Sequence, residues 1–380
     1  MKWEKVKLGD ICKYVTSGGT PKSSIKEYYE PKQIPWLKTK EVNYCRIYET
    51  ESYISKDGLD NSSAKMIPQN SVIVAMYGQG DTAGRVAINK IPLTTNQACC
   101  NLIIDETKAC YEFVYYQLVT LYEKMVSLKN GGAQPNLNAA IIKSMEIKLP
   151  PLKTQRYIAD ILSSYDNLIE NNQKQIKLLE EAAQRLYKEW FVDLRFPGHE
   201  NTKIVDGVPE GWSRTNINEI LTFHRGYDLT KNEMKAGRYP VVGSTTVIGY
   251  HNEFKIKGPG IVTGRSGSLG KYQFIWDNFW PHNTSLYISD YKDHNIFFVY
   301  SLLQTVDFAS LNNGGAIPTL NRNVLSNIEV IEPTDELQEM FAKIAEPQYQ
   351  KIKNLEKQND RLKTARDLLL PKLMSGEVEV

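Results

Sequence analysis

The sequence predicts an α+β protein with two globular domains, each a mixed, barrel-like β-sheet with helices, separated by two long antiparallel coiled-coil helices. Three observations lead to this class: an internal repeat, short apolar runs between glycine- and proline-rich turns, and two long stretches with heptad spacing. Because the repeat is domain-sized and occurs twice, we expect a pseudo-two-fold chain rather than a solenoid.

The internal repeat is clearest in one loop. Asn-Gly-Gly-Ala-Gln-Pro-Asn-Leu-Asn at 130–138 recurs 183 residues later as Asn-Gly-Gly-Ala-Ile-Pro-Thr-Leu-Asn. At the same offset Gln155 matches Gln338, and Pro150 matches Pro333. Further matches at other offsets indicate one scaffold with two divergent surfaces: Trp3 with Trp212, Asn96 with Asn283, and Gly78-x5-Gly84-Arg85 with Gly264-x5-Gly270-Lys271.

Composition shifts divide the chain into four segments. We expect a first domain at 1–151, a central helix at 152–196, a second domain at 197–333 and a C-terminal helix at 334–380. Short apolar runs such as Ser71–Tyr77 and Gly260–Thr263 predict strands. One amphipathic helix per domain is expected, near Glu112–Leu128 and Ile296–Leu311.

The two long helices are predicted to pair with each other along an apolar seam. Asn172, Gln348 and Asn359 fall within the seam, where polar residues fix register at a cost in stability. Pro197-Gly198 and Pro371 mark the approximate helix ends. A helix of about 35 residues spans roughly 50 Å and would separate the domains, although a homodimer seam is the alternative. The predicted pairing residues are Ile158, Leu162, Ile169, Ile176, Leu179, Leu186, Ile352, Leu355, Leu362 and Leu369.

Charge and cysteine content exclude several classes. The net charge of +2 is small for a DNA-binding protein, so partners would supply much of the contact with the backbone. The five cysteines lack Cys-x-x-Cys spacing, which favours free thiols over zinc, and we expect no bound metal. The chain has no signal-peptide pattern and no membrane-spanning apolar run, so we expect a cytoplasmic protein without membrane contact.

In combination, these motifs resemble the specificity (S) subunits of Type I restriction-modification systems. The resemblance rests on the opening Trp3-x4-Leu8-Gly9-Asp10-Ile11, the loop Ser17-Gly18-Gly19-Thr20-Pro21, the Gly-Gly-x-x-Pro-x-Leu loops, Pro-Pro-Leu-x-x-Gln at 150–155, and the stretch 186–196. The second half departs from the pattern, with His224-Arg225-Gly226-Tyr227 in place of the first glycine loop.

The resemblance implies a DNA-recognition subunit without catalytic residues of its own. Its two target-recognition domains would each read half of an asymmetric DNA site, and its helices would dock two methyltransferase subunits and two restriction subunits. S-adenosylmethionine, ATP and Mg²⁺ would be held by those partners, and this chain would bind no cofactor. Three alternatives are a specificity subunit of a methyltransferase-only complex, a coiled-coil adaptor for proteins, and an enzyme with an unrecognised site near Gly264.

Glycine turns and their neighbours supply the candidate DNA contacts. The run from Gly264 to Lys271 departs from a P-loop, so a turn that presents cations to phosphate, or a purely structural turn, is favoured. Arg85 suits phosphate or guanine, although an ion pair with Asp81 explains it equally well. The predicted contacts are Thr20, Lys22, Lys38, Tyr77, Gln79, Arg85, Asn96, Gln134, Asn136, Arg225, Tyr227, Arg265, Ser266, Lys271, Tyr272, Asn283 and Arg322.

Overall fold

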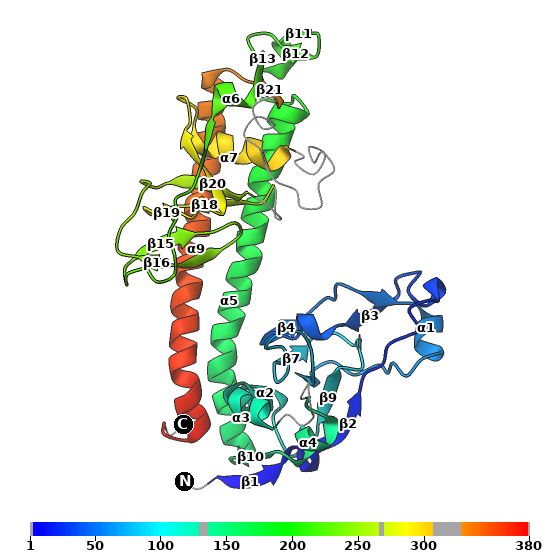
Figure 1. Ribbon diagram of the computed structural model, residues 1–380. Coiled ribbons are helices and arrows are strands. Elements are labelled where there is room, and N and C mark those ends of the chain that lie inside the picture. Colours follow the sequence, from blue (N-terminus) through cyan, green and yellow to red (C-terminus); the bar gives the residue numbers. More distant parts are fainter. Residues whose placement is uncertain (1–2, 129–135, 266–269, 307–327, 379–380) are drawn as a thin grey trace. The chain divides into compact units, whose positions relative to one another are not determined.

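The computed structural model describes residues 3–128, 136–265, 270–306 and 328–378 (Figure 1). The chain forms two compact units: the first contains Met1–Glu170 and Asp360–Val380, and the second contains Asn171–Asn359. Each unit is α+β and contains parts of both long helices, which confirms the predicted fold class. Because this division cuts both helices, the four segments drawn from the sequence stay a prediction.

The first unit is built on a five-stranded sheet in the order β2-β9-β6-β7-β4, accompanied by sheets β5-β3-β8 and β1-β10. Every residue of β6, β7 and β9 is buried, which explains why these strands are continuous apolar runs. The strands are β1 (Glu4–Lys7), β2 (Cys12–Ser17), β3 (Ile34–Leu37), β4 (Cys45–Ile47), β5 (Tyr53–Ile54), β6 (Val72–Ala75), β7 (Val86–Asn89), β8 (Thr94–Thr95), β9 (Cys99–Ile104) and β10 (Glu146–Leu149). The helices are η1 (Leu8–Ile11), η2 (Lys26–Tyr28), η3 (Thr39–Glu41), α1 (Lys56–Asp60), α2 (Tyr111–Thr120), α3 (Tyr122–Ser127) and α4 (Ala139–Ser144).

The second unit repeats this plan with a four-stranded sheet in the order β14-β20-β17-β18. The sheet β16-β15-β19 and the pairs β13-β21 and β11-β12 complete it. The strands are β11 (Ile204–Val205), β12 (Val208–Pro209), β13 (Ser213–Asn216), β14 (Thr222–Arg225), β15 (Tyr239–Val242), β16 (Val247–His251), β17 (Gly260–Gly264), β18 (Tyr272–Ile275), β19 (Trp280–Pro281), β20 (Ser285–Asp290) and β21 (Glu329–Glu332). The shorter helices are η4 (Lys188–Val192), η5 (His199–Asn201), α6 (Ile217–Ile220) and α7 (Ile296–Thr305).

The long helices are α5 (Leu152–Tyr187) and α9 (Asp335–Ser375). Their ends differ from the prediction. Helix α9 continues through Pro371 to Ser375, since the buried Leu373 and Met374 anchor its last turn in the first core. Helix α5 ends before Pro197-Gly198, and the π-turn η4 follows it directly.

Each unit is closed by the start of one long helix and the end of the other. In the first core, Ile158 and Leu162 of α5 pack with Leu370 and Leu373 of α9. In the second core, Phe341 of α9 packs with residues at the end of α5 and in η4, including Tyr187, Trp190 and Phe191. Both globular parts therefore depend on helix segments that are far apart in the sequence.

The two helices run antiparallel within each unit. In the second unit, Asn172 Nδ2 donates to Asn359 Oδ1 at 2.9 Å, and in the first unit Arg366 Nη1 lies 2.6 Å from Asp166 Oδ1. Gln348, the third polar seam residue, is half-buried, and its Oε1 has no hydrogen-bond partner among the described residues. All ten residues predicted to pair the helices are buried or half-buried.

The repeated glutamine anchors the start of each long helix. Gln155 Nε2 donates to Pro150 O at 2.8 Å, and Gln338 Nε2 donates to Pro333 O at 3.0 Å. The sequence match at an offset of 183 residues is thus a match in structure. In the described ranges, no helix combines the length and the apolar character that crossing a membrane requires.

Candidate nucleic-acid interface

A glycine loop and two strand ends meet at one edge of the first unit. Strands β3 and β8 are parallel, so Lys38 and Asn96 follow them at the same edge. Gly18 N donates to Cys99 O at 3.2 Å, and a Cβ on Gly18 would lie 2.2 Å from Asn96 O. Only glycine permits this approach of the backbones. The arrangement is named the Trp36 edge after the side chain beneath it, and it comprises Gly18–Thr20, Lys38 and Asn96–Gln97.

Trp36 supports this edge through its indole ring. The indole Nε1 donates to Gly19 O at 3.0 Å, and the ring is 5% exposed. Lys38 Nζ lies 5.1 Å from the centre of the ring, within the range of a cation–π contact. A positive charge is therefore held beside the glycine loop.

The second unit has a corresponding Trp280 edge, which comprises Gly226–Asp228, Lys255 and His282–Asn283. Strands β15 and β19 are parallel, Gly226 N donates to Ser285 O at 3.1 Å, and a Cβ on Gly226 would lie 2.1 Å from His282 O. Trp280 Nε1 donates to Tyr227 O at 3.4 Å, and Lys255 Nζ lies 4.7 Å from the Trp280 ring centre.

The backbone bonds establish which residues of the two edges are equivalent. Asn96 N donates to Leu37 O and His282 N donates to Val242 O, both at 2.9 Å. Asn96 therefore corresponds to His282, and the sequence match of Asn96 with Asn283 is wrong by one position. Asn283 corresponds instead to Gln97, because both edges have one residue fewer than the assumed spacing.

The supporting tryptophan lies on different strands in the two edges. Trp36 belongs to β3 and pairs with Thr94 of β8, whereas Trp280 belongs to β19 and pairs with Val241 of β15. Each indole nonetheless donates to the carbonyl of the residue that follows the first edge glycine. The hydrogen bond is kept although the residue that makes it has moved to the neighbouring strand.

The strand–turn–strand matches are half correct. Arg85 and Lys271 are equivalent because they precede paired strands, and the glycines before them have positive φ values of 94° and 77°. Gly264, however, pairs with Ser285 as Ala75 pairs with Cys99, so Gly264 does not correspond to Gly78. The second turn is shorter than the first, which the sequence spacing concealed.

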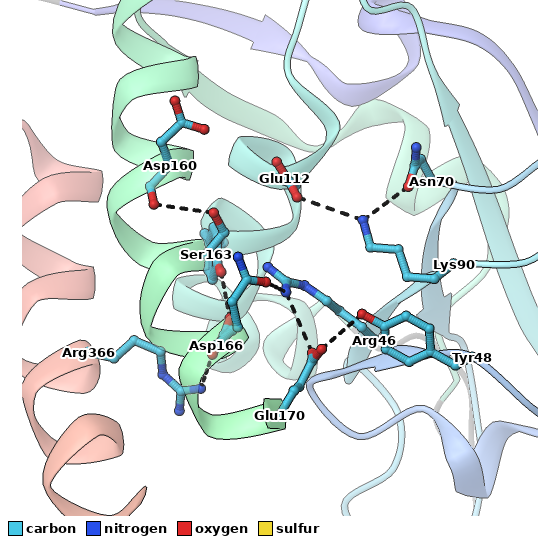
Figure 2. Close-up of polar contacts among 12 residues, drawn as sticks. Arg46, Tyr48, Asn70, Lys90, Glu112, Asp160, Ser163, Asp166, Glu170 and Arg366 are labelled. Atoms are coloured by element: carbon cyan, nitrogen blue, oxygen red, sulfur yellow. Dashed lines mark hydrogen bonds and ion pairs between the residues drawn. The ribbon is translucent and has the colours of Figure 1, made fainter. Parts of the chain in front are cut away.

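A polar network joins β4 and the following residues to α5 in the first unit. Figure 2 shows Arg46 beside Glu170, with Arg46 Nη1 3.6 Å from Glu170 Oε1, and Tyr48 donating to Glu170 Oε2 at 2.9 Å. The Arg46 side chain is 5% exposed and also donates to Asn167. The carboxylate of Glu170 raises the pKa of Arg46 against the opposing effect of burial.

Asp166 extends this network to the second long helix. It accepts a hydrogen bond from the Tyr116 hydroxyl of α2 at 2.5 Å and pairs with Arg366 of α9 at 2.6 Å (Figure 2). Burial and the Asp166 carboxylate raise the pKa of Tyr116, so its hydroxyl remains the donor. The orientation of the globular part of the first unit on its helices is thus fixed by directional bonds.

Comparison with known protein families decides the identity of this architecture. The model of the type I restriction modification DNA specificity domain matches residues 1–181 and again residues 209–364. The chain belongs to the type I DNA specificity family. The two matched stretches correspond to the two halves of the repeat.

Individual relatives agree with this assignment. The chain is similar to the type I restriction enzyme MjaIX specificity subunit of Methanocaldococcus jannaschii, with 29% identity over 100% of this chain and 94% of the relative. It is 23% identical to the HindI specificity subunit of Haemophilus influenzae, over 99% of both chains. Its fold resembles the crystal structure of the S subunit from M. genitalium, with a TM-score of 0.63, 19% identity, and coverage of 98% and 96%.

Several predicted DNA contacts of this specificity protein gather in the first unit. Thr20, Lys38 and Asn96 lie on the Trp36 edge. Tyr77 adjoins it, because Met76 N donates to Ala98 O at 2.8 Å, and Asn136 precedes Leu137, whose N donates to Met76 O at 3.0 Å. The exposed Lys22 and Gln79 lie on flanking turns, and Gln134 falls outside the described residues.

Arg85 is engaged within the protein. Its Nη1 donates to Asn43 Oδ1 at 3.0 Å, and its Nη2 pairs with Asp81. The ion pair considered as the alternative from the sequence is therefore present, and a DNA contact of Arg85 stays a prediction.

In the second unit, Arg225, Tyr227 and Asn283 meet at the Trp280 edge. Arg225 Nε donates to Asn283 O at 3.4 Å, and Arg265 adjoins the edge through a 3.1 Å bond from its N to Thr284 O. The exposed Lys271 starts the neighbouring segment. Ser266 and Arg322 fall outside the described residues.

Tyr272 lies apart from the Trp280 edge. It packs against the second core and lines a cavity of about 400 Å³ together with Tyr300 and Tyr349. Burial raises the pKa of its hydroxyl. A DNA contact of Tyr272 stays a prediction without support from its position.

Sequence reasoning missed Gln97, Lys255 and both supporting tryptophans. No spacing rule pointed to them, since Lys255 approaches Trp280 from a distant turn and the tryptophans are not at equivalent positions in the sequence. An indole beside an aligned glycine loop was the one available signal.

Proposed function

We infer that this chain is the specificity subunit of a type I restriction-modification complex that reads a bipartite, asymmetric DNA target. The observation that supports this most is that the Trp36 and Trp280 edges share a backbone arrangement but carry different side chains. The first edge has Thr20 and Gln97 where the second has Asp228 and Asn283. Equal scaffolds with unlike side chains suit two half-sites of unlike sequence.

Cations beside each edge support contact with the DNA backbone. Lys38 is held over Trp36 and Lys255 over Trp280, and Arg225 adds a third positive group. Such groups position a protein on phosphates, whereas base contacts supply the sequence preference. With a net charge of +2, the chain relies on its partners for further backbone contact.

Exposed apolar side chains on the long helices support the docking of partner helices. In the first unit, Tyr157 and Leu168 of α5 are 55% and 47% exposed, and Leu368 of α9 is 65% exposed. In the second unit, Leu178 of α5 is 63% and Ile344 of α9 is 44% exposed. Helical partners commonly bury such residues. We assign this role to two methyltransferase subunits, with two restriction subunits joining the complex.

The chemistry of the complex is assigned to those partners. S-adenosylmethionine, ATP and Mg²⁺ would be bound by the methyltransferase and restriction subunits, and this chain would contribute addresses rather than catalysis. If purification yields a methyltransferase but no restriction subunit, the chain serves a methyltransferase-only complex.

Mapping N6-methyladenine in the genome tests the proposal. Cells with the native gene, without it, and with residues 1–151 exchanged for those of another family member would be compared. We expect methylation to require the gene and the exchange to alter one half-site alone. Methylation that is independent of the gene would favour a coiled-coil adaptor, and a change in both half-sites would refute modular reading.

A further inference from the structure

The two edges share one side-chain contact that spans from the glycine loop to the opposite loop. On the Trp36 edge, the Thr20 hydroxyl donates to Gln97 Oε1. On the Trp280 edge, Asn283 Nδ2 donates to Asp228 Oδ1. These contacts are called the cross-edge pairs.

The members of the pairs occupy equivalent positions. Thr20 follows Gly19, whose N donates to Thr95 O at 2.9 Å, and Asp228 follows Tyr227, whose N donates to Pro281 O at 2.8 Å. Gln97 and Asn283 each follow a residue that closes a three-residue turn: Cys99 N donates to Asn96 O at 3.1 Å and Ser285 N to His282 O at 2.9 Å. Both copies therefore keep an amide side chain at one place, although the neighbouring sequences have diverged.

The pairs leave hydrogen-bonding capacity for a ligand. An amide oxygen accepts two hydrogen bonds, so Gln97 Oε1 retains a lone pair beside its NH₂ group. A carboxylate only accepts, so Asp228 turns the Asn283 NH₂ toward itself and leaves Asn283 Oδ1 as an acceptor. Thr20, Gln97 and Asp228 are exposed, and Asn283 is half-buried.

We propose that the cross-edge pairs read bases in the major groove, with Gln97 reading the first half-site and Asp228 with Asn283 the second. This proposal rests on the DNA-reading function proposed above. A glutamine amide pairs with N6 and N7 of adenine, and carboxylate or amide oxygens accept from the amino group of adenine or cytosine. Each pair fixes the rotamer of its reading amide before DNA binds, which lowers the entropic cost of the contact.

The first test replaces the amides in the full chain, co-expressed with its methyltransferase subunit, and maps N6-methyladenine genome-wide. Gln97→Leu is expected to relax one base position of one half-site by roughly 5- to 150-fold, the effect of one lost base contact. Asn283→Leu is expected to do so in the other half-site. Gln69→Leu and Asn218→Leu, at exposed amides outside both edges, serve as controls and should leave the motif unchanged.

A second variant separates base reading from a purely structural clip. The double substitution Thr20→Asp with Gln97→Asn moves the second pair into the first edge and keeps a cross-edge bond. Base reading predicts a changed base at one position of the first half-site. An unchanged motif, with uniformly weaker methylation in Gln97→Leu, would overturn the proposal. A native protein that directs no bipartite motif would instead refute the proposed function itself.

Discussion

Asn172 donates a hydrogen bond to Asn359 across the seam of the long helices, and each residue is only 4% exposed. Their seam neighbours Ile169 and Leu355 are buried apolar residues. A buried amide pair stabilises one alignment of two helices because a shift of either helix leaves both amides without partners. The register of the seam is thus set by this pair.

Replacing one member of the pair is expected to cost more than replacing both. Asn172→Leu leaves the Asn359 amide buried without its partner and should lower the free energy of unfolding by about 1–3 kcal/mol. The double variant with Asn359→Leu should recover most of this loss, because two leucines pack in the seam. Denaturant unfolding of the three variants measures the coupling, and additive losses would contradict the pairing role.

Loss of the Asp166 carboxylate should destabilise the first unit. Asp166→Asn removes the charge that faces Arg366 and weakens the bond from Tyr116, so we expect a loss of about 1–3 kcal/mol. The control is Glu181→Gln, whose partner Lys177 lies 4.0 Å away on an exposed helix face, and its cost should stay below about 0.5 kcal/mol. Equal losses in denaturant unfolding would show that the network contributes no more than a surface ion pair.

The two tryptophans should affect opposite half-sites. Trp36→Phe removes the bond from the indole to Gly19 O, and Trp280→Phe removes the bond to Tyr227 O. Each change should cost about 0.5–1.5 kcal/mol of stability and weaken binding through its own edge. Competition binding with DNA altered in one half-site measures the effect. Identical responses to both altered DNAs would contradict the assignment of one edge to each half-site.

Lengthening α5 is predicted to lengthen the unread gap in the target. Four added residues extend a helix by about 6 Å, which is near two base pairs at about 3.4 Å each. Methylation mapping would report the new spacing. A matched insertion at Asp206-Gly207, in the turn between β11 and β12, should leave the gap as it is. An unaltered gap in the α5 variant would show that the helix does not set the spacing.

The cysteine thiols of the native protein should react slowly with iodoacetamide. Burial raises the pKa of Cys12 to about 11 and of Cys100 to about 12, so little thiolate exists at pH 8. Unfolding restores an ordinary thiol pKa and should accelerate alkylation. The expected rate order is guanidinium-treated protein well above native protein, measured by mass spectrometry. Fast modification of the native protein would indicate that these strands open readily.

The sequence predicted features that depend on periodicity or on identical residues at a fixed offset. The duplication, the long helices and the seam position of Asn172 are of this kind, as is the matching of Gln155 with Gln338. It did not predict features kept by backbone bonds between different residues. Trp36 and Trp280 support equivalent carbonyls from neighbouring strands, so no alignment of letters relates them.

Length changes and tertiary packing caused the remaining errors. The shortened turn before Lys271 displaced the glycine match, and a one-residue difference displaced the match of Asn96. Pro371 does not end α9, because burial of Leu373 and Met374 outweighs the local preference of proline. Individual DNA contacts could not be chosen from the sequence, since the composition of loops does not reveal which side chains are already engaged, as Arg85 is.

The first core includes Leu370, Leu373 and Met374, which are translated more than 200 residues after the last strand of that unit. A ribosome has therefore made the entire second globular part before the first can bury its apolar surface in full. Domains usually fold in the order of synthesis, but here the first must wait for the final turns of α9. Chaperones that shield nascent chains would then act chiefly on the earlier half, and nonsense mutations late in the gene would damage the domain encoded first.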